Sequence, residues 1–316
     1  MNDSSHPGAQ SVAVFGGAVL DRKYQAQERL VAATSNPVAS SRSHGGVARN
    51  MAENLVRLGV PTAFYSIVGE DEAGAALVDR MAALGADVTG VVRAPERSTA
   101  EYVAVLDTDH ELALGVADMA IFSAYDEKEL DRAWPRMRKA SWVLADCNFS
   151  SAVLAALVER CSSDGVWLAF NTVSAPKALK LRGLEAGIDL LFTNRDEANA
   201  LLGLEPKTDA AGAAQALSGA GFKAAVLTDG GDGYAIIEAG VANWFPAMPA
   251  SPVDITGAGD AFVAGTLCRL VAGDRLAQAT CAGALLAART TETLESVLPD
   301  LSPAFFDGAA SRQTTE

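Results

Sequence analysis

The stretch DITGAGDAFVAG, residues 254–265, places one carboxylate, Asp260, directly after a glycine-rich turn and before an apolar run. The run is apolar nearly all round, with Phe262, Val263 and Leu267, and this pattern predicts a buried helix that begins at the turn. The free N–H groups and the dipole of such a helix start form an anion site, and glycines let a phosphate approach closely.

An acid in that first turn has two interpretations. It is either a residue that compensates the helix dipole, or a base that takes a proton from an attacking hydroxyl. The second interpretation fits phosphoryl transfer, with Asp260 deprotonating the acceptor while the N–H groups of Ala258, Gly259 and Asp260 stabilise the transferred group. On this stretch alone both interpretations stay open.

Composition narrows the class of protein. The chain has 316 residues, of which 49% are hydrophobic, enough for one large α/β domain or two ordinary ones. A net charge of −14 argues against a nucleic-acid partner, although a local backbone site can still bind ATP. No apolar leader and no run of about 20 apolar residues is present, so we expect a cytoplasmic protein without a membrane span. The four cysteines show no metal-type spacing and are expected to be buried free thiols.

Continuously apolar runs alternate with helical patterns along the chain. This alternation predicts an α/β fold with a mostly parallel central sheet flanked by helices, whose ligands bind at the carboxyl ends of the strands. The strand-like runs are 11–17, 62–69, 141–148, 165–173, 188–194 and 223–231, and the helical stretches include 47–58, 72–84, 150–163, 195–202 and 208–220.

Two extended segments interrupt this alternation. Residues 24–44 are polar, and residues 98–117 contain a hairpin pattern around DTDH. We expect segments of about 18–45 and 98–120 to form a small antiparallel β lid, which also pairs with a second copy to give a homodimer. A single domain is expected to span residues 11–305, with flexible tails at 1–10 and 306–316.

The stretch that opens this section resembles the C-terminal signature of the PfkB (ribokinase-like) carbohydrate kinases. In that resemblance Asp260 is the catalytic base, and Gly257, Ala258 and Gly259 form the anion hole. SHGGVARNMAENLVRLG, residues 43–59, is similar to the N-terminal signature of the same family. Gly45 and Gly46 would let a sugar approach, and Asn50 would offer its amide to hydroxyl groups.

The resemblance implies further roles for polar residues at strand ends. Asp21 would bind sugar hydroxyls, and the N-x-x-E motif of Asn194 and Glu197 would hold Mg²⁺ through water. Asn194, Thr228, Gly230, Gly233 and Thr256 would contact ATP. The loop LTDGGDGYAII, 227–237, leads into a strand instead of a helix, which argues against an NAD-dependent oxidoreductase.

Two positions leave the ion chemistry open. Asp254 matches a residue that helps to hold a monovalent cation such as K⁺ in several relatives, but residues 288–299 lack the expected Gly-Ala pattern. Asn171-Thr172 stands where relatives carry Asp-Pro, which removes a negative charge near the metal.

Within the family the chain is most similar to the kinases of pseudouridine, through SNP, ADCN and VSAPK. The reaction implied is transfer of phosphate from ATP to the 5′-hydroxyl of pseudouridine. A kinase of uridine, adenosine or ribose is the alternative, and a non-catalytic nucleoside sensor is a less favoured one. Candidate substrate contacts near the lid are Asn36, Thr99, Tyr102, Asp118, Met119, Asn148 and Lys177, with Asn36, Asp118 and Asn148 ranked above Lys177.

Overall fold

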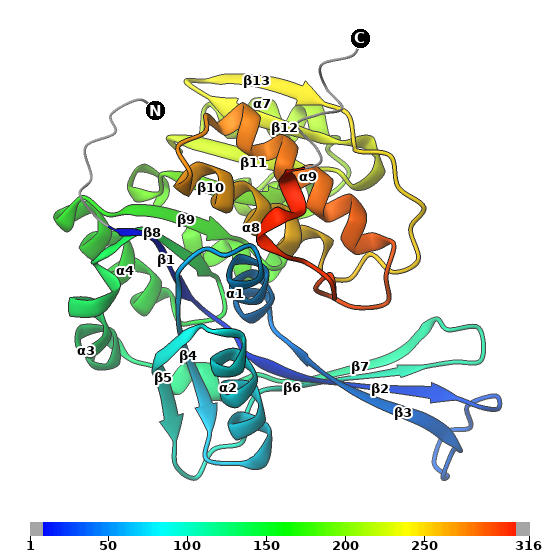
Figure 1. The fold of residues 1–316 in the computed structure, drawn as a ribbon. Helices are drawn as coiled ribbons and strands as arrows, with labels where there is room; N and C mark the ends of the chain where they lie inside the picture. Colours follow the sequence, from blue (N-terminus) through cyan, green and yellow to red (C-terminus); the bar gives the residue numbers. More distant parts are fainter. Residues whose placement is uncertain (1–8, 308–316) are drawn as a thin grey trace.

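The computed structural model describes residues 9–307 and contains a large and a small sheet (Figure 1). The strands of the large sheet lie in the order β13-β12-β11-β10-β9-β8-β1-β4-β5. All neighbours from β11 to β5 are parallel, and only the edge strands β12 and β13 are antiparallel. The bounds are β1 (Ala9–Phe15), β4 (Thr62–Gly69), β5 (Asp87–Ala94), β8 (Ala140–Asp146), β9 (Trp167–Asn171), β10 (Leu190–Asn194), β11 (Ala224–Thr228), β12 (Tyr234–Glu238) and β13 (Val241–Phe245). The predicted parallel α/β sheet is confirmed.

Helices cover both faces of this sheet (Figure 1). Alternate residues of β1 belong to different hydrophobic clusters: Val12 and Val14 to one, Phe15 to the other. The first cluster contains residues of α1 (Val47–Arg57), α2 (Glu72–Leu84), α8 (Ala258–Val271) and α9 (Leu276–Thr291). The second contains residues of α3 (Glu127–Met137), α4 (Ser151–Asp164), α5 (Ala175–Ala178), α6 (Arg195–Leu202) and α7 (Ala210–Ser218). Burial on both faces explains why the strands lack polar alternation.

Helix α8 is buried because it packs between other elements. Phe262, Val263 and Leu267 are almost inaccessible and belong to the cluster shared with α1 and the sheet. Gly265 lies so close to α9 that a Cβ there would be 2.9 Å from the Cα of Gly283. The first turn of α8 therefore starts inside the protein, with Asp260 only 8% exposed.

The small sheet contains β2 (Val19–Ala26), β3 (Val38–Gly45), β6 (Glu101–Leu106) and β7 (Leu112–Asp118), in the order β3-β2-β6-β7. It extends away from the main body as the predicted lid (Figure 1). The two outer pairs are antiparallel hairpins, as expected, but the inner pair β2–β6 is parallel. Local sequence patterns predict the two hairpins, β2–β3 and β6–β7. The parallel pairing of β2 with β6, called the seam of the lid below, joins residues far apart in the sequence, and local patterns do not predict it.

The predicted tails are shorter than expected where the structure describes them. Residues 9 and 10 begin β1, and Phe306 ends a short 3₁₀ turn, Pro303–Phe306. The remaining residues of both predicted tails, 1–8 and 308–316, lie outside the described part. No helix within residues 9–307 has the length and apolar character needed to cross a bilayer. The four cysteines are free thiols as expected, although only Cys147 and Cys161 are fully buried.

Candidate active site

A pocket of about 360 Å³ lies between the lid and the carboxyl ends of the sheet strands. It brings together residues from the two glycine-rich motifs, the lid and the strand ends. Its lining is Val19, Asp21, Gly46, Val47, Asn50, Tyr102, Met119, Asn148, Val173, Lys177, Thr256, Gly257, Gly259 and Asp260. Most of the predicted acceptor-side residues therefore converge on one cavity, although they are far apart in the sequence.

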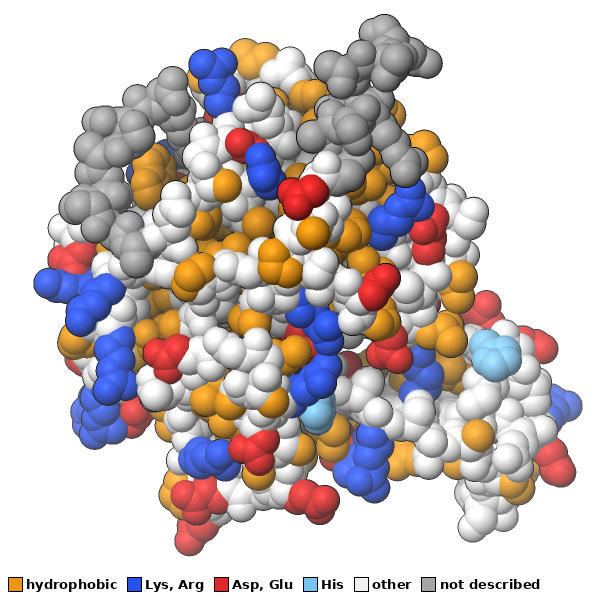
Figure 2. All heavy atoms as spheres, viewed as in Figure 1, with side chains coloured by type: hydrophobic (Ala, Val, Ile, Leu, Met, Phe, Trp, Pro, Cys, Tyr) orange, Lys and Arg blue, Asp and Glu red, His pale blue; other side chains and the backbone are white. Residues whose placement is uncertain are grey.

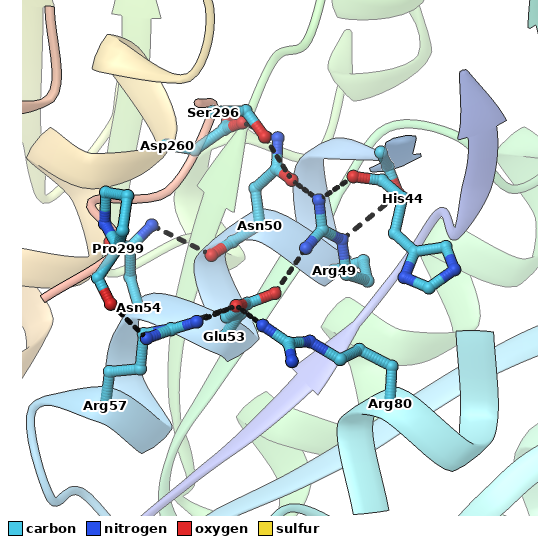
Figure 3. Close-up of polar contacts among 11 residues, drawn as sticks. His44, Arg49, Asn50, Glu53, Asn54, Arg57, Arg80, Asp260, Ser296 and Pro299 are labelled. Atoms are coloured by element: carbon cyan, nitrogen blue, oxygen red, sulfur yellow. Dashed lines mark hydrogen bonds and ion pairs between the residues drawn. The ribbon is translucent and has the colours of Figure 1, made fainter. Parts of the chain in front are cut away.

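Asp260 is the buried acid of this pocket. The amide Nδ2 of Asn50 donates to its Oδ2 at 2.7 Å, which leaves Oδ1 for another partner (Figure 3). Burial raises the pKa of Asp260 to about 7, although the Asn50 hydrogen bond and the Arg49 charge oppose this. The carboxylates of Asp146 and Glu197 add to the rise. A carboxyl with such a pKa is suited to accept a proton near neutral pH.

The turn before α8 needs glycine at its first position. Gly257 has φ +82°, and a Cβ there would lie 2.1 Å from the carbonyl oxygen of Ser296. We expected the N–H of Ala258 to be free for a ligand, but it donates to Ile255 O at 3.2 Å. Within the described chain the N–H groups of Gly257, Gly259 and Asp260 meet no acceptor, so they are available as donors at this helix start.

Asp21 enters the pocket from β2 beside the glycine pair. A Cβ on Gly45 would lie 1.8 Å from Asp21 Oδ2, so the glycine makes room for this carboxylate. Burial raises the pKa of Asp21 to about 6, while the charges of Arg49 and Lys23 lower it. Its oxygens are well suited to accept hydrogen bonds from sugar hydroxyls. Gly45 thus acts through Asp21, whereas Gly46 lines the pocket itself.

The far wall of the pocket holds a chain of polar side chains. Lys177 Nζ donates to Asn148 Oδ1 at 2.6 Å, and Asn148 Nδ2 donates to Asp146 Oδ2 at 2.7 Å. The same Asp146 oxygen also accepts from the N–H groups of Gly17 at 2.9 Å and Ala48 at 3.1 Å. Lys177 is therefore a half-buried pocket residue beside Asn148, whereas Asn36 and Asp118, which were also ranked above it, are not in the lining.

Three predicted substrate contacts lie outside this pocket. Asn36 closes its own loop, accepting from Val31 N at 2.8 Å. Asp118 is exposed at the end of β7, where it accepts from Ala120 N at 3.2 Å. Thr99 lines a separate cavity of about 480 Å³ and is bonded to Asp71 at 2.6 Å. Asn36 and Asp118 thus stabilise local turns, a role that these residue types commonly have, whereas Thr99 joins the end of β4 to the start of α2.

The predicted nucleotide residues follow the ends of β10 and β11. Asn194 is the N-cap of α6, accepting from Glu197 N at 2.9 Å in a capping box. Thr228 ends β11 with its hydroxyl 3.4 Å from Thr193 O, and Gly230 faces open space. A Cβ on Gly233 would lie 2.2 Å from Phe245 O, so this glycine serves the β12–β13 pairing.

Hydrogen bonds within the protein limit which oxygens of Glu197 could face a metal ion. The Thr172 hydroxyl and the Asn194 N–H both donate to Glu197 Oε2, which leaves Oε1 as the oxygen without a partner in the described chain. No group of three or more His, Cys, Asp or Glu within residues 9–307 is arranged to hold a metal ion. Glu197 Oε1 is the kind of oxygen that can contact a hydrated divalent ion through water.

The two positions left open for ion chemistry both support turns. Asp254 accepts from Thr256 N at 2.8 Å, and Asn171 Oδ1 accepts from Val173 N at 2.8 Å. The amide of Asn171 thus shapes the turn after β9.

Several residues that shape the site are not apparent from the motifs. Arg49, Glu53 and Asp146 are buried, and Lys180 Nζ donates to the carbonyl oxygens of Cys147, Asn148 and Phe149. One pattern could have indicated the first pair. Arg49 and Glu53 are four residues apart in a helix that the sequence already placed in the core.

The comparisons with known proteins agree with this geometry. Residues 9–300 match the pfkB family of carbohydrate kinases. The chain belongs to this family. It is 33% identical over 257 residues to the pseudouridine kinase of Escherichia coli (strain K12), covering 80% of this chain and 82% of that protein.

Solved pfkB-type structures share the fold. A carbohydrate kinase from Agrobacterium tumefaciens superposes with a TM-score of 0.81 at 27% identity, covering 95% of this chain and 96% of that one. An Arabidopsis thaliana ribokinase complexed with ribose and ATP has a TM-score of 0.81 at 22% identity, covering 92% and 95% of the two chains. The fold is therefore ribokinase-like. Membership of this kinase family makes the chain a phosphotransferase that acts on a sugar or nucleoside and uses ATP with a divalent metal.

Proposed function

We propose that the protein transfers the γ-phosphate of ATP to the 5′-hydroxyl of pseudouridine, giving pseudouridine 5′-phosphate and ADP. The observation that carries the proposal is the position of Asp260. It is a buried acid with a pKa of about 7, at the start of α8, in the same pocket as Asp21. The similarity to the Escherichia coli pseudouridine kinase supports the choice of acceptor.

Asp21, Asp260 and the N–H groups at the start of α8 have separate roles toward the acceptor in this proposal. Asp21 would accept hydrogen bonds from ribose hydroxyls, which directs the 5′-hydroxyl toward Asp260. Asp260 would take the hydroxyl proton as the oxygen forms its bond to the γ-phosphorus and the bond from that phosphorus to the β-phosphate oxygen breaks. The N–H groups of Gly257 and Gly259 would stabilise the negative charge on the transferred group.

The nucleotide side follows from the strand ends. Thr228, Gly230 and Thr256 would contact ATP, with Gly233 shaping the loop. Asn194 and Glu197 would hold Mg²⁺ through water, and the ion, when bound, neutralises phosphate charge. A K⁺ site at Asp254 is part of the same proposal, as is a kinase unit spanning residues 11–305.

The pocket also has a surface for a nucleobase. Tyr102 and Met119 provide an apolar face from the lid, and Val173 after β9 adds a further apolar side chain to the lining. Lys177 Nζ bonds to Asn148 and keeps further N–H groups that a base carbonyl could accept. A base held by its carbonyls and its ring face fits a pyrimidine nucleoside better than free ribose.

A direct acceptor panel tests this proposal. The purified protein, ATP and Mg²⁺ are incubated with pseudouridine, uridine, adenosine or ribose, and kcat/KM is measured for each. We expect the highest value with pseudouridine and a product phosphorylated at the 5′ position by NMR. A higher value with uridine, adenosine or ribose would replace the acceptor, and absence of turnover with any of them would favour a nucleoside sensor.

Two matched carboxylate variants connect the panel to the pocket. Asp21→Asn is expected to raise KM for the nucleoside about 10-fold or more, because an amide accepts fewer hydrogen bonds than a carboxylate. Asp118→Asn removes an exposed lid carboxylate outside the pocket and is expected to leave KM unchanged. Equal effects of the two variants would contradict the assigned roles.

The lid supports a proposal on assembly. Leu112, Leu114 and Val116 alternate along β7 and are 56%, 57% and 52% exposed. They share a sheet face with Val103 and Val105 of β6, opposite the face on which Tyr102 lines the pocket. Since isolated apolar sheet faces are normally covered, we propose a homodimer in which this face packs against a second copy.

A further inference from the structure

We propose that Arg49 is a positioning residue that fixes the orientation of the Asn50 amide and thereby keeps Asp260 available as a base. The proposal rests on the role of Asp260 proposed above. Arg49 occupies the first turn of α1, is 3% exposed and does not line the pocket (Figure 3). It therefore acts on the site only through its neighbours.

The guanidinium of Arg49 has a fixed set of partners. Its Nη2 donates to Asn50 Oδ1 and to the carbonyl oxygen of His44, and its Nε donates to Gly45 O at 3.4 Å. Its Nη1 donates to Glu53 Oε2, one turn further along α1. Figure 3 shows this guanidinium between the His44 carbonyl, Asn50 and Glu53. A planar group held at several points cannot rotate away from the amide.

This contact decides which end of the Asn50 amide faces Asp260. A guanidinium donates hydrogen bonds and never accepts them, so only the Oδ1 end of the amide can face Arg49. The Nδ2 end then donates to Asp260 Oδ2 at 2.7 Å. The reversed amide would present an oxygen to Asp260, an arrangement that is favourable only if Asp260 carries a proton. Arg49 thus selects the amide orientation that stabilises the ionised, basic form of Asp260.

The charge of Arg49 is balanced inside the protein. Glu53 is 3% exposed, and besides Arg49 it accepts from Arg57 Nη2 at 2.7 Å and Arg80 Nη2 at 3.3 Å. The arrangement gives Arg49 a buried counter-ion that is itself held by two further cations (Figure 3). Because a buried charge needs a partner, Glu53 allows Arg49 to remain ionised beside the pocket.

Charged groups of several elements face Asp260. Arg49 of α1 is the cation whose charge lowers its pKa, whereas Asp146 at the end of β8 and Glu197 of α6 raise it. Asp21 of β2 and Lys177 of α5 line the same pocket, and the imidazole of His44 on β3 lies near Arg49 (Figure 3). Among these groups only Arg49 combines a favourable charge with a contact to the Asn50 amide.

The test compares pH profiles of kcat for Arg49→Met and the wild type. Because Asp260 must be ionised to act, loss of Arg49 is expected to move the acid limb of the profile up by about one pH unit. The variant should lose about 10-fold in kcat at pH 6.5 and recover to within about threefold of wild type at pH 9. A loss of equal size at every pH would overturn the proposal, because distortion of the fold does not depend on protonation of Asp260.

Further variants distinguish a positioning role of Arg49 from a contribution to folding alone. Arg49→Met/Glu53→Gln removes both members of the buried ion pair, replaces the single variant if that one unfolds, and should show the same shifted limb. Arg49→Lys should rescue the limb only in part, since ammonium keeps the charge without the planar fork. Arg80→Met and His44→Gln change side chains that do not touch Asn50, and both should retain the wild-type limb.

A second measurement does not depend on any acceptor. The carboxyl ¹³C shift of Asp260 is followed by NMR as a function of pH in protein labelled at aspartate, with Asp260→Asn used for assignment. Arg49→Met should raise the observed pKa by about one unit even if no nucleoside is phosphorylated. An unchanged Asp260 titration would overturn the role of Arg49, whereas absence of turnover in all variants would overturn the proposed function alone.

Discussion

Asp260 is held in surroundings that oppose its ionisation, because burial raises its pKa more than Asn50 and Arg49 lower it. The sequence predicted the acid and its glycines, since they form a local pattern at a helix start. It did not predict that Arg49 is buried behind Asn50, because an arginine next to an asparagine in a helix is equally compatible with a solvent-exposed helix face. Burial of that position depends on α8, which is more than 200 residues away in the chain.

Replacing Asp260 tests the base directly. Asp260→Asn keeps the acceptor oxygen for Asn50 but cannot take a proton, so kcat is expected to fall by about 10³-fold or more. Nucleoside binding, measured by calorimetry, should change by less than about threefold. Turnover close to that of the wild type would show that another group accepts the proton.

Asp260→Asn, which is expected to lower kcat, is expected to raise the stability of the folded protein above neutral pH. The folded protein holds a proton on Asp260 up to about pH 7, whereas an unfolded chain releases it near the ordinary value of 3.8. Stability therefore falls as pH rises between these values, and the loss persists above pH 7. Asp260→Asn should raise the free energy of unfolding at pH 8 by on the order of 2 kcal/mol and have no such effect below pH 4, measured by urea denaturation. A destabilised variant at pH 8 would contradict the raised pKa.

At the scale of elements, the pocket is formed where β8, α1 and the lid meet. Periodicity predicted the central strands and helices because burial on both faces gives long apolar runs. It predicted that α1 is buried through a face formed by Val47, Met51 and Leu55. The structure shows that Arg49 and Glu53 of the same helix are buried as well. An apolar stripe identifies one buried face, and it cannot show that polar residues on another face are covered by α8 and α2.

Asp146 joins these elements through its carboxylate. Asp146→Asn replaces one acceptor oxygen by an NH₂ group that faces other N–H groups. The free energy of unfolding should therefore fall by about 3 kcal/mol. Its effect on the pocket should also raise KM for the nucleoside, because Asn148 and Lys177 lose their support. Asp164→Asn, at the exposed end of α4, is the control and should change stability by less than about 1 kcal/mol. Equal effects of both substitutions in denaturant unfolding would contradict the role of Asp146.

At the scale of the whole molecule, a large covered sheet supports a lid that extends from one side (Figure 1). On the face shown in Figure 2, acidic and basic side chains are interspersed, in keeping with small-molecule partners rather than a polyanion. The sequence predicted the lid from interrupted alternation. The parallel seam and the positions of Asn36, Thr99 and Asp118 depend on long-range packing that local patterns do not contain.

The proposed dimer is tested on the lid. Leu114→Lys with Val116→Lys places two charges on the exposed face of β7 and should convert the dimer into a monomer, measured by light scattering at micromolar concentration. Val241→Lys changes an exposed residue of the edge strand β13, and should leave the mass unchanged. A monomeric wild-type protein would exclude the proposed assembly.

The parallel seam of the lid has a consequence for the order in which the chain is made. It joins residues 20–25 to residues 101–106, so that Asp21 and Tyr102 are register neighbours. A chain emerging from the ribosome passes through a long stage in which Asp21 has been made and Tyr102 beside it has not. The lid side of the pocket therefore cannot form before the N-terminal third has been synthesised and its two hairpins have met, and the Asp260 side is added only when the C-terminal part of the chain follows.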